Sequence, residues 1–279
     1  MPESVRLSVR KTYKLFIGGA FPRSESGRSY PVRSAAGDFL ANAALASRKD
    51  VRDAVRAARS AFGGWAKATA YNRGQILYRI AEMLEGRRDQ FVGYDIEPST
   101  VDAAIDRWVW YAGWADKIAT VYGGANPVAG PYFNLSAPEP TGVVGIVAPA
   151  DPLLGLVSVL APAIVTGNTA VVLASEQNPL PAITLAEVLA TSDLPGGVVN
   201  LLTGRAAETA PWLASHLDVN AIDLTGVSDP ELAVSLEEAA AENLKRVLRP
   251  GPADWTAEPG IERMTTLLET KTVWHPKGV

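Results

Sequence analysis

Short aliphatic runs alternate with helical patterns in the second half of the chain. Four runs have the length of buried strands: residues 143–148, 169–173, 198–202 and 221–224. Four segments that follow them carry apolar residues at helical spacing: residues 153–166, 181–191, 206–215 and 230–247. This alternation predicts an α/β fold with a Rossmann-like parallel sheet and flanking helices. The crevice at the carboxyl ends of such strands is the expected nucleotide site.

The first half of the chain predicts helices that follow an extended N-terminal region. The first forty residues favour extended structure, with a short strand pair turning at Gly18-Gly19. A helix is expected from Ser47, which caps its first turn, to Gly63-Gly64. A second helix covers the apolar positions from Ile76 to Leu84, and a third opens near Ser99.

Two further segments predict extended structure, one in the middle of the chain and one at its end. Residues 123–140 are rich in Gly, Pro and Asn and resemble loop and strand. After Pro250 the pattern predicts a loop, a helix over residues 261–269 and a terminal strand over residues 270–274.

Composition excludes several classes of function. The 279 residues are 47% hydrophobic and 20% charged, which is ordinary globular usage. The net charge of −4, without a run of basic residues, argues against a nucleic-acid partner. There is no cysteine and there are two histidines, so disulfides, thiolate chemistry and a histidine-based metal site lack material, and we predict no metal ligands.

The longest apolar stretch, residues 143–165, has the length of a membrane span. Pro149, Asp151, Pro152 and Pro162 interrupt it, so a buried strand followed by a helix is the better interpretation. Residues 1–11 have no apolar segment typical of a secretory signal. We therefore expect a cytoplasmic protein without a membrane partner.

Several ordered motifs carry a family resemblance. The most specific is the segment LPGGVVNLLTG at 194–204, and AIVTGNTAVVL at 163–173 is almost as diagnostic. YKLFIGG at 13–19 and the helix pattern of residues 50–65 add to them. In this order and spacing the segments resemble the aldehyde dehydrogenase superfamily over about 250 residues. The resemblance implies a cofactor-type domain of the Rossmann kind.

The catalytic residues that the resemblance implies do not carry over, so we predict none. The nucleophile of the family is a cysteine, which this chain does not contain. Its general base is a glutamate, but Leu248-Arg249-Pro250-Gly251 stands where the acid is expected, and a guanidinium cannot accept a proton. The family places an oxyanion-stabilising asparagine where this chain has Asp151, whose negative charge would oppose the developing oxyanion.

The cofactor site implied by the resemblance is only partly retained. The candidate binding residues all follow predicted strands: Pro149, Glu176, Gly204, Thr225 and Gly226. The lysine that accompanies Glu176 in the family is missing, Val227 replaces a serine, and no G-x-G-x-x-G follows the first strand. The cofactor therefore stays unassigned, with NAD and NADP open. The competing interpretation is that these are turn residues without a ligand.

The resemblance also implies a division of the chain and a partner. Residues 1–141 would form the N-terminal hairpin, helices and arm strands, residues 142–249 the cofactor-type domain, and residues 250–279 a short remnant with a C-terminal oligomerisation strand. In the family, the N-terminal hairpin, a strand pair near 131–140 and the C-terminal segment build an arm that pairs with a neighbouring subunit. Here the catalytic domain expected between Val247 and Thr270 is nearly absent.

Three functional hypotheses follow. The first is a non-catalytic subunit that assembles with a full-length aldehyde dehydrogenase as a structural or regulatory partner. The second is a stand-alone NAD(P)-binding sensor. The third is a residual NAD(P)-dependent oxidoreductase acting on aldehydes, or other chemistry around Asp151, Glu176 or Asp223.

Overall fold

A five-stranded parallel sheet forms the centre of the computed structural model, which describes residues 10–278. Residues 1–9 and Val279 lie outside the described residues. The expectation of no secretory signal concerns residues 1–11, so most of that segment lies outside them too. The strands are β5 (Val143–Val147), β6 (Thr169–Leu173), β7 (Val199–Leu202), β8 (Ala221–Asp223) and β9 (Arg246–Leu248). Their order is β7-β6-β5-β8-β9, with every neighbouring pair parallel. The predicted α/β fold is confirmed.

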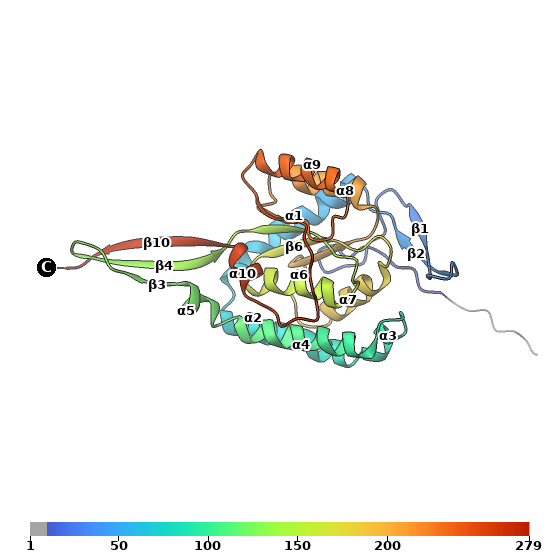
Figure 1. The fold of residues 1–279 in the computed structure, drawn as a ribbon, viewed down its shortest axis with the longest axis horizontal. Coiled ribbons are helices and arrows are strands. Elements are labelled where there is room, and N and C mark those ends of the chain that lie inside the picture. The colour runs from blue at the N-terminus through green and yellow to red at the C-terminus, as the bar shows by residue number, and fades with distance from the viewer. Residues whose placement is uncertain (1–9, 279) are drawn as a thin grey trace, which may run out of the picture.

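Helices cover both faces of this sheet (Figure 1). One face carries α6 (Leu154–Val165) and α7 (Leu180–Ala190), with α2 (Ala70–Glu85) and α4 (Pro98–Trp114) outside them. The other face carries α1 (Arg48–Lys67), α8 (Ala206–Ser215) and α9 (Pro230–Ala241). Two five-residue helices flank α4 in the chain, α3 (Arg88–Val92) and α5 (Ile118–Tyr122).

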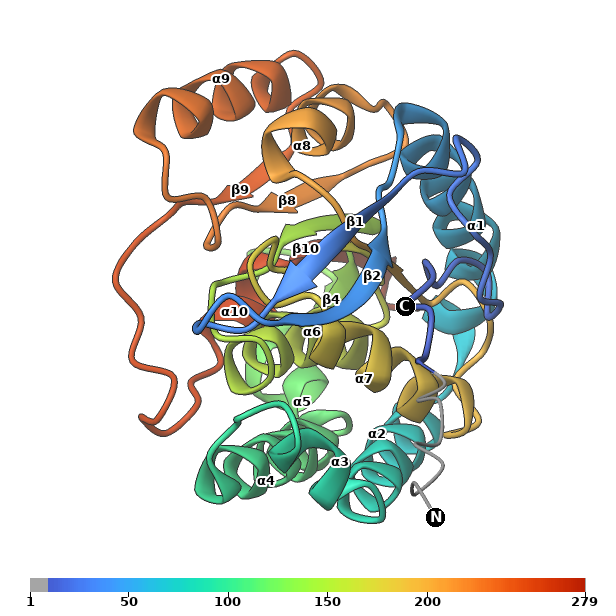
Figure 2. The same cartoon turned by 90° about the vertical axis from the view of Figure 1, so that its right-hand side faces the viewer.

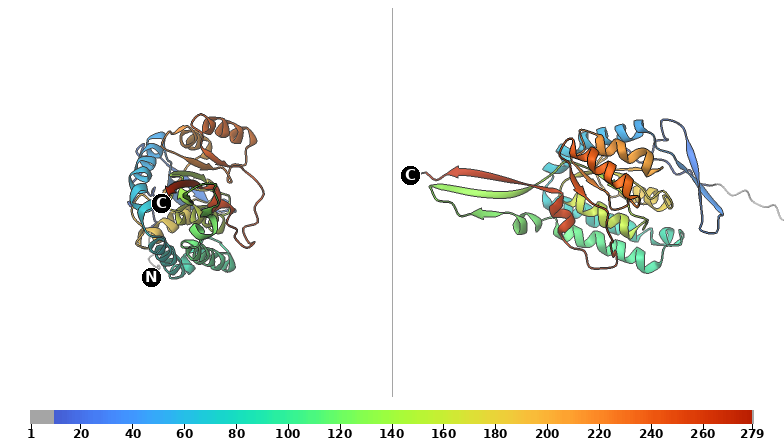
Figure 3. Two further views of the ribbon diagram at one scale, coloured as in Figure 1. Left: turned by 90° about the vertical axis from the view of Figure 1, so that its left-hand side faces the viewer. Right: turned by 45° about the horizontal axis from the view of Figure 1, so that its top comes forward.

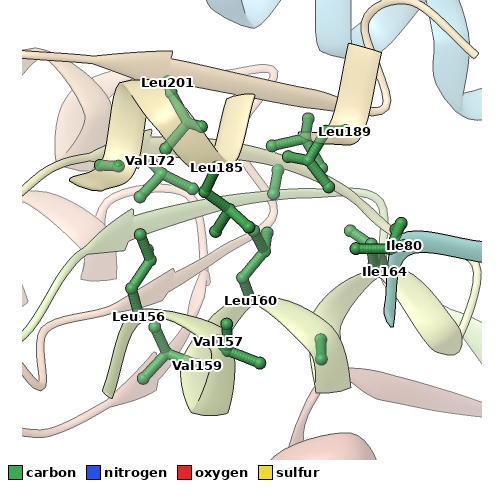
Figure 4. Close-up of a cluster of buried hydrophobic side chains, with 14 of the residues drawn as sticks. Ile80, Leu156, Val157, Val159, Leu160, Ile164, Val172, Leu185, Leu189 and Leu201 are labelled. Carbon is green, nitrogen blue, oxygen red and sulfur yellow. The ribbon is translucent and has the colours of Figure 1, made fainter. Parts of the chain in front are cut away.

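The main core lies between the sheet and the helices α6 and α7 (Figure 4). Leu156 and Leu160 of α6 meet Leu185 of α7 and Val172 of β6 in this cluster. Every residue of β5, β6 and α6 is buried, which explains why their sequences are apolar runs rather than alternating patterns. None of the described helices combines the length and the apolar composition that crossing a membrane requires.

The first helix is longer than its glycines suggest. We expected Gly63-Gly64 to end it, but α1 continues to Lys67. Trp65 is buried and its indole N–H donates to the carbonyl of Ile164 at 2.8 Å, so tertiary packing outweighs the cost of two helical glycines. The predicted cap is confirmed, because Ser47 and Asp50 form a reciprocal capping box.

Helix α9 is shorter than predicted. It ends at Ala241, and residues 246–248 form β9 instead of continuing the helix to Val247. Leu244 has φ +59°, and the amide N–H groups of Leu244 and Lys245 donate to the carbonyls of Ala241 and Ala240. This is a Schellman ending with leucine at the position that usually holds glycine, so the sequence carries no stop signal.

Replacing Leu244 with glycine is expected to raise the free energy of unfolding by about 0.5–1 kcal/mol. The left-handed conformation costs a leucine roughly 1–2 kcal/mol, and glycine adopts it freely at some cost in unfolded-state entropy. The Leu244 side chain is 90% exposed, so little packing is lost. Urea unfolding measures the change. Leu217→Gly is the matched control, since Leu217 is also highly exposed but is not among the positive-φ residues; an equal gain in both variants would contradict the explanation.

The N-terminal hairpin that the resemblance implies lies later in the chain than the turn expected at Gly18-Gly19. Strands β1 (Ser29–Arg33) and β2 (Phe39–Ala44) pair antiparallel. The strand pair expected at Gly18-Gly19 is reduced to one bridge between Ile17 and Ala20, while Phe16 pairs with Leu201 at the edge of β7. The hairpin lies at the end of the molecule opposite the C-terminus (Figure 1).

A three-stranded arm projects from the body (Figure 3). Its strands are β3 (Gly124–Asn126), β4 (Tyr132–Pro140) and β10 (Leu268–Pro276), in the order β10-β4-β3. Nine residue pairs join β10 to β4 antiparallel. The segment near 131–140, where the resemblance implies a strand pair, forms the single long strand β4. The helix expected over 261–269 is the single turn α10 (Glu262–Thr266), and the terminal strand is longer than predicted.

Candidate functional site

The sheet has a topological switch point between β5 and β8. From β5 the chain passes through α6 to β6 and then to β7, whereas β8 leads through α9 to β9 on the other side. In open parallel sheets, ligands bind at the carboxyl ends of the strands where the order reverses. Figure 2 views the molecule from the side opposite the arm, with the hairpin β1–β2 in front. The residues that follow β5 and β8 therefore define the candidate site.

Asp151 occupies the loop between β5 and α6. Its Oδ1 atom accepts hydrogen bonds from the backbone N–H groups of Leu153 at 3.1 Å and Gly155 at 2.8 Å. These amides belong to the first turn of α6, where unpaired N–H groups make an anion-binding position in many α/β proteins. In this chain a side-chain carboxylate already fills that role.

Gly155 lies where three side chains converge. A Cβ atom at this position would be 2.9 Å from Pro149 Cγ, 2.9 Å from Asp151 Cβ and 3.2 Å from the indole nitrogen of Trp255. The first two separations are shorter than side-chain carbons tolerate. The first turn of α6 is therefore in tight contact with the chain around it.

Replacing Gly155 with alanine is expected to lower the free energy of unfolding by about 1–3 kcal/mol, because the added methyl overpacks this contact. Chemical unfolding measures the loss. Gly63→Ala is the control, since a Cβ at Gly63 in helix α1 meets nothing within 4 Å and alanine favours the helix. Loss of stability in the control alone would refute the close packing at Gly155.

A buried ion pair marks the carboxyl end of β8. Asp223 is 1% exposed and accepts a hydrogen bond from Arg263 Nη1 at 2.5 Å. The backbone N–H and the hydroxyl of Thr225 donate to the other carboxylate oxygen at 2.9 and 2.5 Å. Burial raises the pKa of Asp223, and the Arg263 guanidinium and the Thr225 donors oppose that rise.

The predicted residues Thr225 and Gly226 are engaged by the chain itself. The Thr225 hydroxyl donates to Asp223 and accepts from Arg263 Nη2 at 3.1 Å. The Gly226 N–H donates to the carbonyl of Val147, and a Cβ at Gly226 would lie 2.0 Å from the carbonyl oxygen of Ala148. The turn after β8 thus lies directly against the end of β5, close to Pro149. Val227 is buried in the hydrophobic cluster of α1, α8 and α9.

The other two predicted residues lie apart from this contact. Gly204 follows β7 with φ +142° and packs on the backbone of Ala46. Glu176 is exposed beyond the end of β6. Tyr30 of β1 lies near both, and its pKa is raised by burial and by the Glu176 carboxylate. The predicted residues therefore form two groups. Pro149, Thr225 and Gly226 lie together at the ends of β5 and β8, whereas Gly204 and Glu176 lie beyond the ends of β7 and β6.

Three residues of the site were not predicted from the sequence. Arg107 on α4 donates from Nη1 to Ser158 Oγ at 2.7 Å, and from Nη2 to the carbonyls of Trp255 at 2.7 Å and Ala257 at 3.0 Å. The Arg263 guanidinium carbon lies 5.5 Å from the Trp255 ring centroid. These residues fix the segment after β9 against α6, and no sequence motif announces a contact of this kind. Among residues 10–278, no cluster of His, Cys, Asp and Glu has the arrangement of a metal site.

Sequence comparisons relate the chain to known aldehyde dehydrogenases. The model of the aldehyde dehydrogenase family matches residues 21–249. Retinal dehydrogenase 2 of Gallus gallus is 36% identical over 262 residues, which are 88% of this chain and 49% of that protein. Cytosolic aldehyde dehydrogenase 1 of Elephantulus edwardii is 34% identical over 252 residues, which are 84% of this chain and 49% of that protein. The chain spans about half the length of these curated relatives.

Solved structures give the same result. The NAD+ complex of an aldehyde dehydrogenase from Bacillus cereus has a TM-score of 0.80 at 29% identity, covering 85% of this chain and 50% of that chain. HpcC from Thermus thermophilus has a TM-score of 0.79 at 32% identity, covering 85% of this chain and 47% of that chain. The similarity therefore extends from sequence to the arrangement of the elements.

Proposed function

This chain belongs to the aldehyde dehydrogenase family, and from that premise we propose that it is a non-catalytic subunit that assembles with a full-length aldehyde dehydrogenase as a structural or regulatory partner. The observation that carries the proposal is the projecting arm of β3, β4 and β10, whose aromatic side chains Phe133 and Trp274 are exposed and whose β10 edge pairs with no further strand among the described residues.

The chemistry of the candidate site supports a non-catalytic role. The chain has no cysteine to attack an aldehyde. After β9 stands Arg249, which pairs with Glu237 at 2.9 Å and cannot accept a proton. At the position expected for an oxyanion-stabilising amide, Asp151 presents a carboxylate that is bonded to the first turn of α6. A negative charge there opposes a developing oxyanion.

The two faces of the arm support an assembly role. Alternation along the strands places Tyr132 and Trp274 on one face, with their rings 5.8 Å apart, and Phe133 and Leu135 on the other. Phe133 is 58% exposed and Trp274 is 56% exposed. A narrow ribbon with apolar side chains on both faces gains little stability alone in water, so contact with another protein would stabilise it.

The outer edge of the arm supports pairing with a strand of the partner. Strand β10 bonds to β4 along one side, and its other side carries unpaired backbone groups within the described part of the chain. Such an edge is a template for addition of another strand. A subunit of the same family is the partner that this proposal names, because the resemblance to that family implies an arm that pairs with a neighbouring subunit.

Isolation of the tagged chain from its native host tests the proposal. We expect a full-length aldehyde dehydrogenase to co-purify in fixed stoichiometry, identified by mass spectrometry, and the two purified chains to recombine in vitro. We expect the isolated chain to oxidise no aldehyde with NAD+ or NADP+ above the buffer rate. Recovery of a stable monomer alone, or turnover by the isolated chain, would refute this function.

A further inference from the structure

The gap between the first turn of α6 and the end of β8 is the position where a doubly wound sheet accepts the phosphates of a dinucleotide. Asp151 places a carboxylate on the two N–H groups of that turn. A phosphate that displaced this anion would take away the two N–H donors of the Asp151 carboxylate, and a phosphate beside it would be repelled, because like charges repel at short range.

The segment 250–263, here called the closing segment, lies over the same gap. Its Trp255 indole nitrogen is 3.2 Å from the position of a Cβ on Gly155. The buried Arg107 holds the backbone of this segment through the carbonyls of Trp255 and Ala257. Hydrogen bonds from a buried guanidinium to two carbonyls fix the position of the segment.

Arg263 anchors the other end of the closing segment. It reaches the buried Asp223 at 2.5 Å and the Thr225 hydroxyl at 3.1 Å, so both polar groups at the end of β8 are already paired. Its guanidinium also lies 5.5 Å from the Trp255 ring centroid. The two anchored ends bring an aromatic ring and a cation into the gap from one continuous segment.

The residues present do not fit NAD or NADP. Val227 is buried in the hydrophobic cluster and its side chain offers no donor to a phosphate. Gly226 packs against the Ala148 carbonyl, and its N–H already donates to the carbonyl of Val147. Among the five candidate binding residues only Glu176 is exposed, and one carboxylate beside Tyr30 does not make a dinucleotide site.

We propose that the closing segment replaces the dinucleotide, with Trp255 and Arg263 filling the gap at β5 and β8, so that this fold is maintained without a cofactor and excludes one. This inference goes beyond the proposed assembly and does not depend on a partner. It also separates this chain from a stand-alone NAD(P) sensor, which would need the same gap to be open.

Calorimetric titration of the unaltered chain is the first test. We expect no saturable heat with NAD+ or NADP+ up to millimolar concentration, and no rise in the melting temperature. Saturable binding of either dinucleotide would overturn the proposal. Because the isolated chain is used, this outcome is independent of whether a partner co-purifies.

Hydrogen–deuterium exchange of the same chain is the second test. Trp255→Ala is expected to increase exchange of the amides of Leu153 and Gly155 by about tenfold or more, because local opening becomes easier without the covering ring. Trp274→Ala on the arm is the matched control and should leave that peptide unchanged. Equal exchange in both variants would show that Trp255 does not cover the turn. If Trp255→Ala fails to fold, the titration still decides the proposal.

Discussion

Replacing Arg263 with glutamine is expected to lower the free energy of unfolding at neutral pH by about 3–5 kcal/mol. The change removes the cation from a carboxylate that is 1% exposed, and an unpaired buried charge costs that much. Urea unfolding of the variant and of the unaltered chain measures the difference. Arg205→Gln is the matched control, since the Arg205–Glu208 pair is exposed and pairs of that kind contribute about 0–1 kcal/mol.

The deficit of Arg263→Gln should depend on pH. Without the guanidinium, burial leaves the pKa of Asp223 raised, so the folded state holds the proton more tightly than the unfolded state. Stability from such a group is complete at low pH and is lost as pH rises through the carboxyl range. The variant should therefore come closer to the unaltered chain at pH 5 than at pH 7.5. In Asp223→Asn/Arg263→Gln this dependence should disappear; a deficit unaffected by pH in the single variant would contradict an unpaired carboxylate.

Changing Phe133 and Trp274 together to glutamate is expected to weaken association with the partner subunit by about thirtyfold or more. A buried aromatic at the centre of an interface contributes about 2 kcal/mol or more, and 1.4 kcal/mol is a factor of ten. The two residues lie on opposite faces of the arm and are more than half exposed in the single chain. The double variant should keep its circular dichroism spectrum, since neither side chain belongs to the core.

Association is measured by surface plasmon resonance against the partner that co-purifies. Tyr71→Glu is the matched control, because Tyr71 is 69% exposed on α2 and belongs to none of the strands of the arm. We expect the control to bind like the unaltered chain. If the arm variant also binds normally, the arm is not the surface that holds the subunits together.

The sheet is the part of the fold that the sequence predicts best. Strands β5 and β6 are uninterrupted aliphatic runs, because both of their faces are buried. Strand β9 was wrongly assigned to a helix, since its separation from α9 depends on the positive φ of Leu244. A leucine in that conformation is held by its surroundings, and no local pattern indicates it.

The candidate site likewise contains residues that the sequence predicts and residues that it does not. The family resemblance implies Pro149, Thr225 and Gly226 as candidates, and the structure places all three near the switch point. Arg263 and Arg107 were missed because they act across the fold: their partners Asp223 and Trp255 are 40 and 148 residues away. Contacts over such separations depend on how the elements pack, which a single sequence does not specify.

The proposed function makes this chain a subunit of a larger assembly held by its arm. The most direct test measures the mass of the purified chain, alone and after mixing with the co-purified full-length aldehyde dehydrogenase, by sedimentation velocity. We expect one complex containing both chains, whose formation the Phe133→Glu/Trp274→Glu variant prevents. Two separate species at all mixing ratios, with the unaltered chain sedimenting as a monomer, would contradict it.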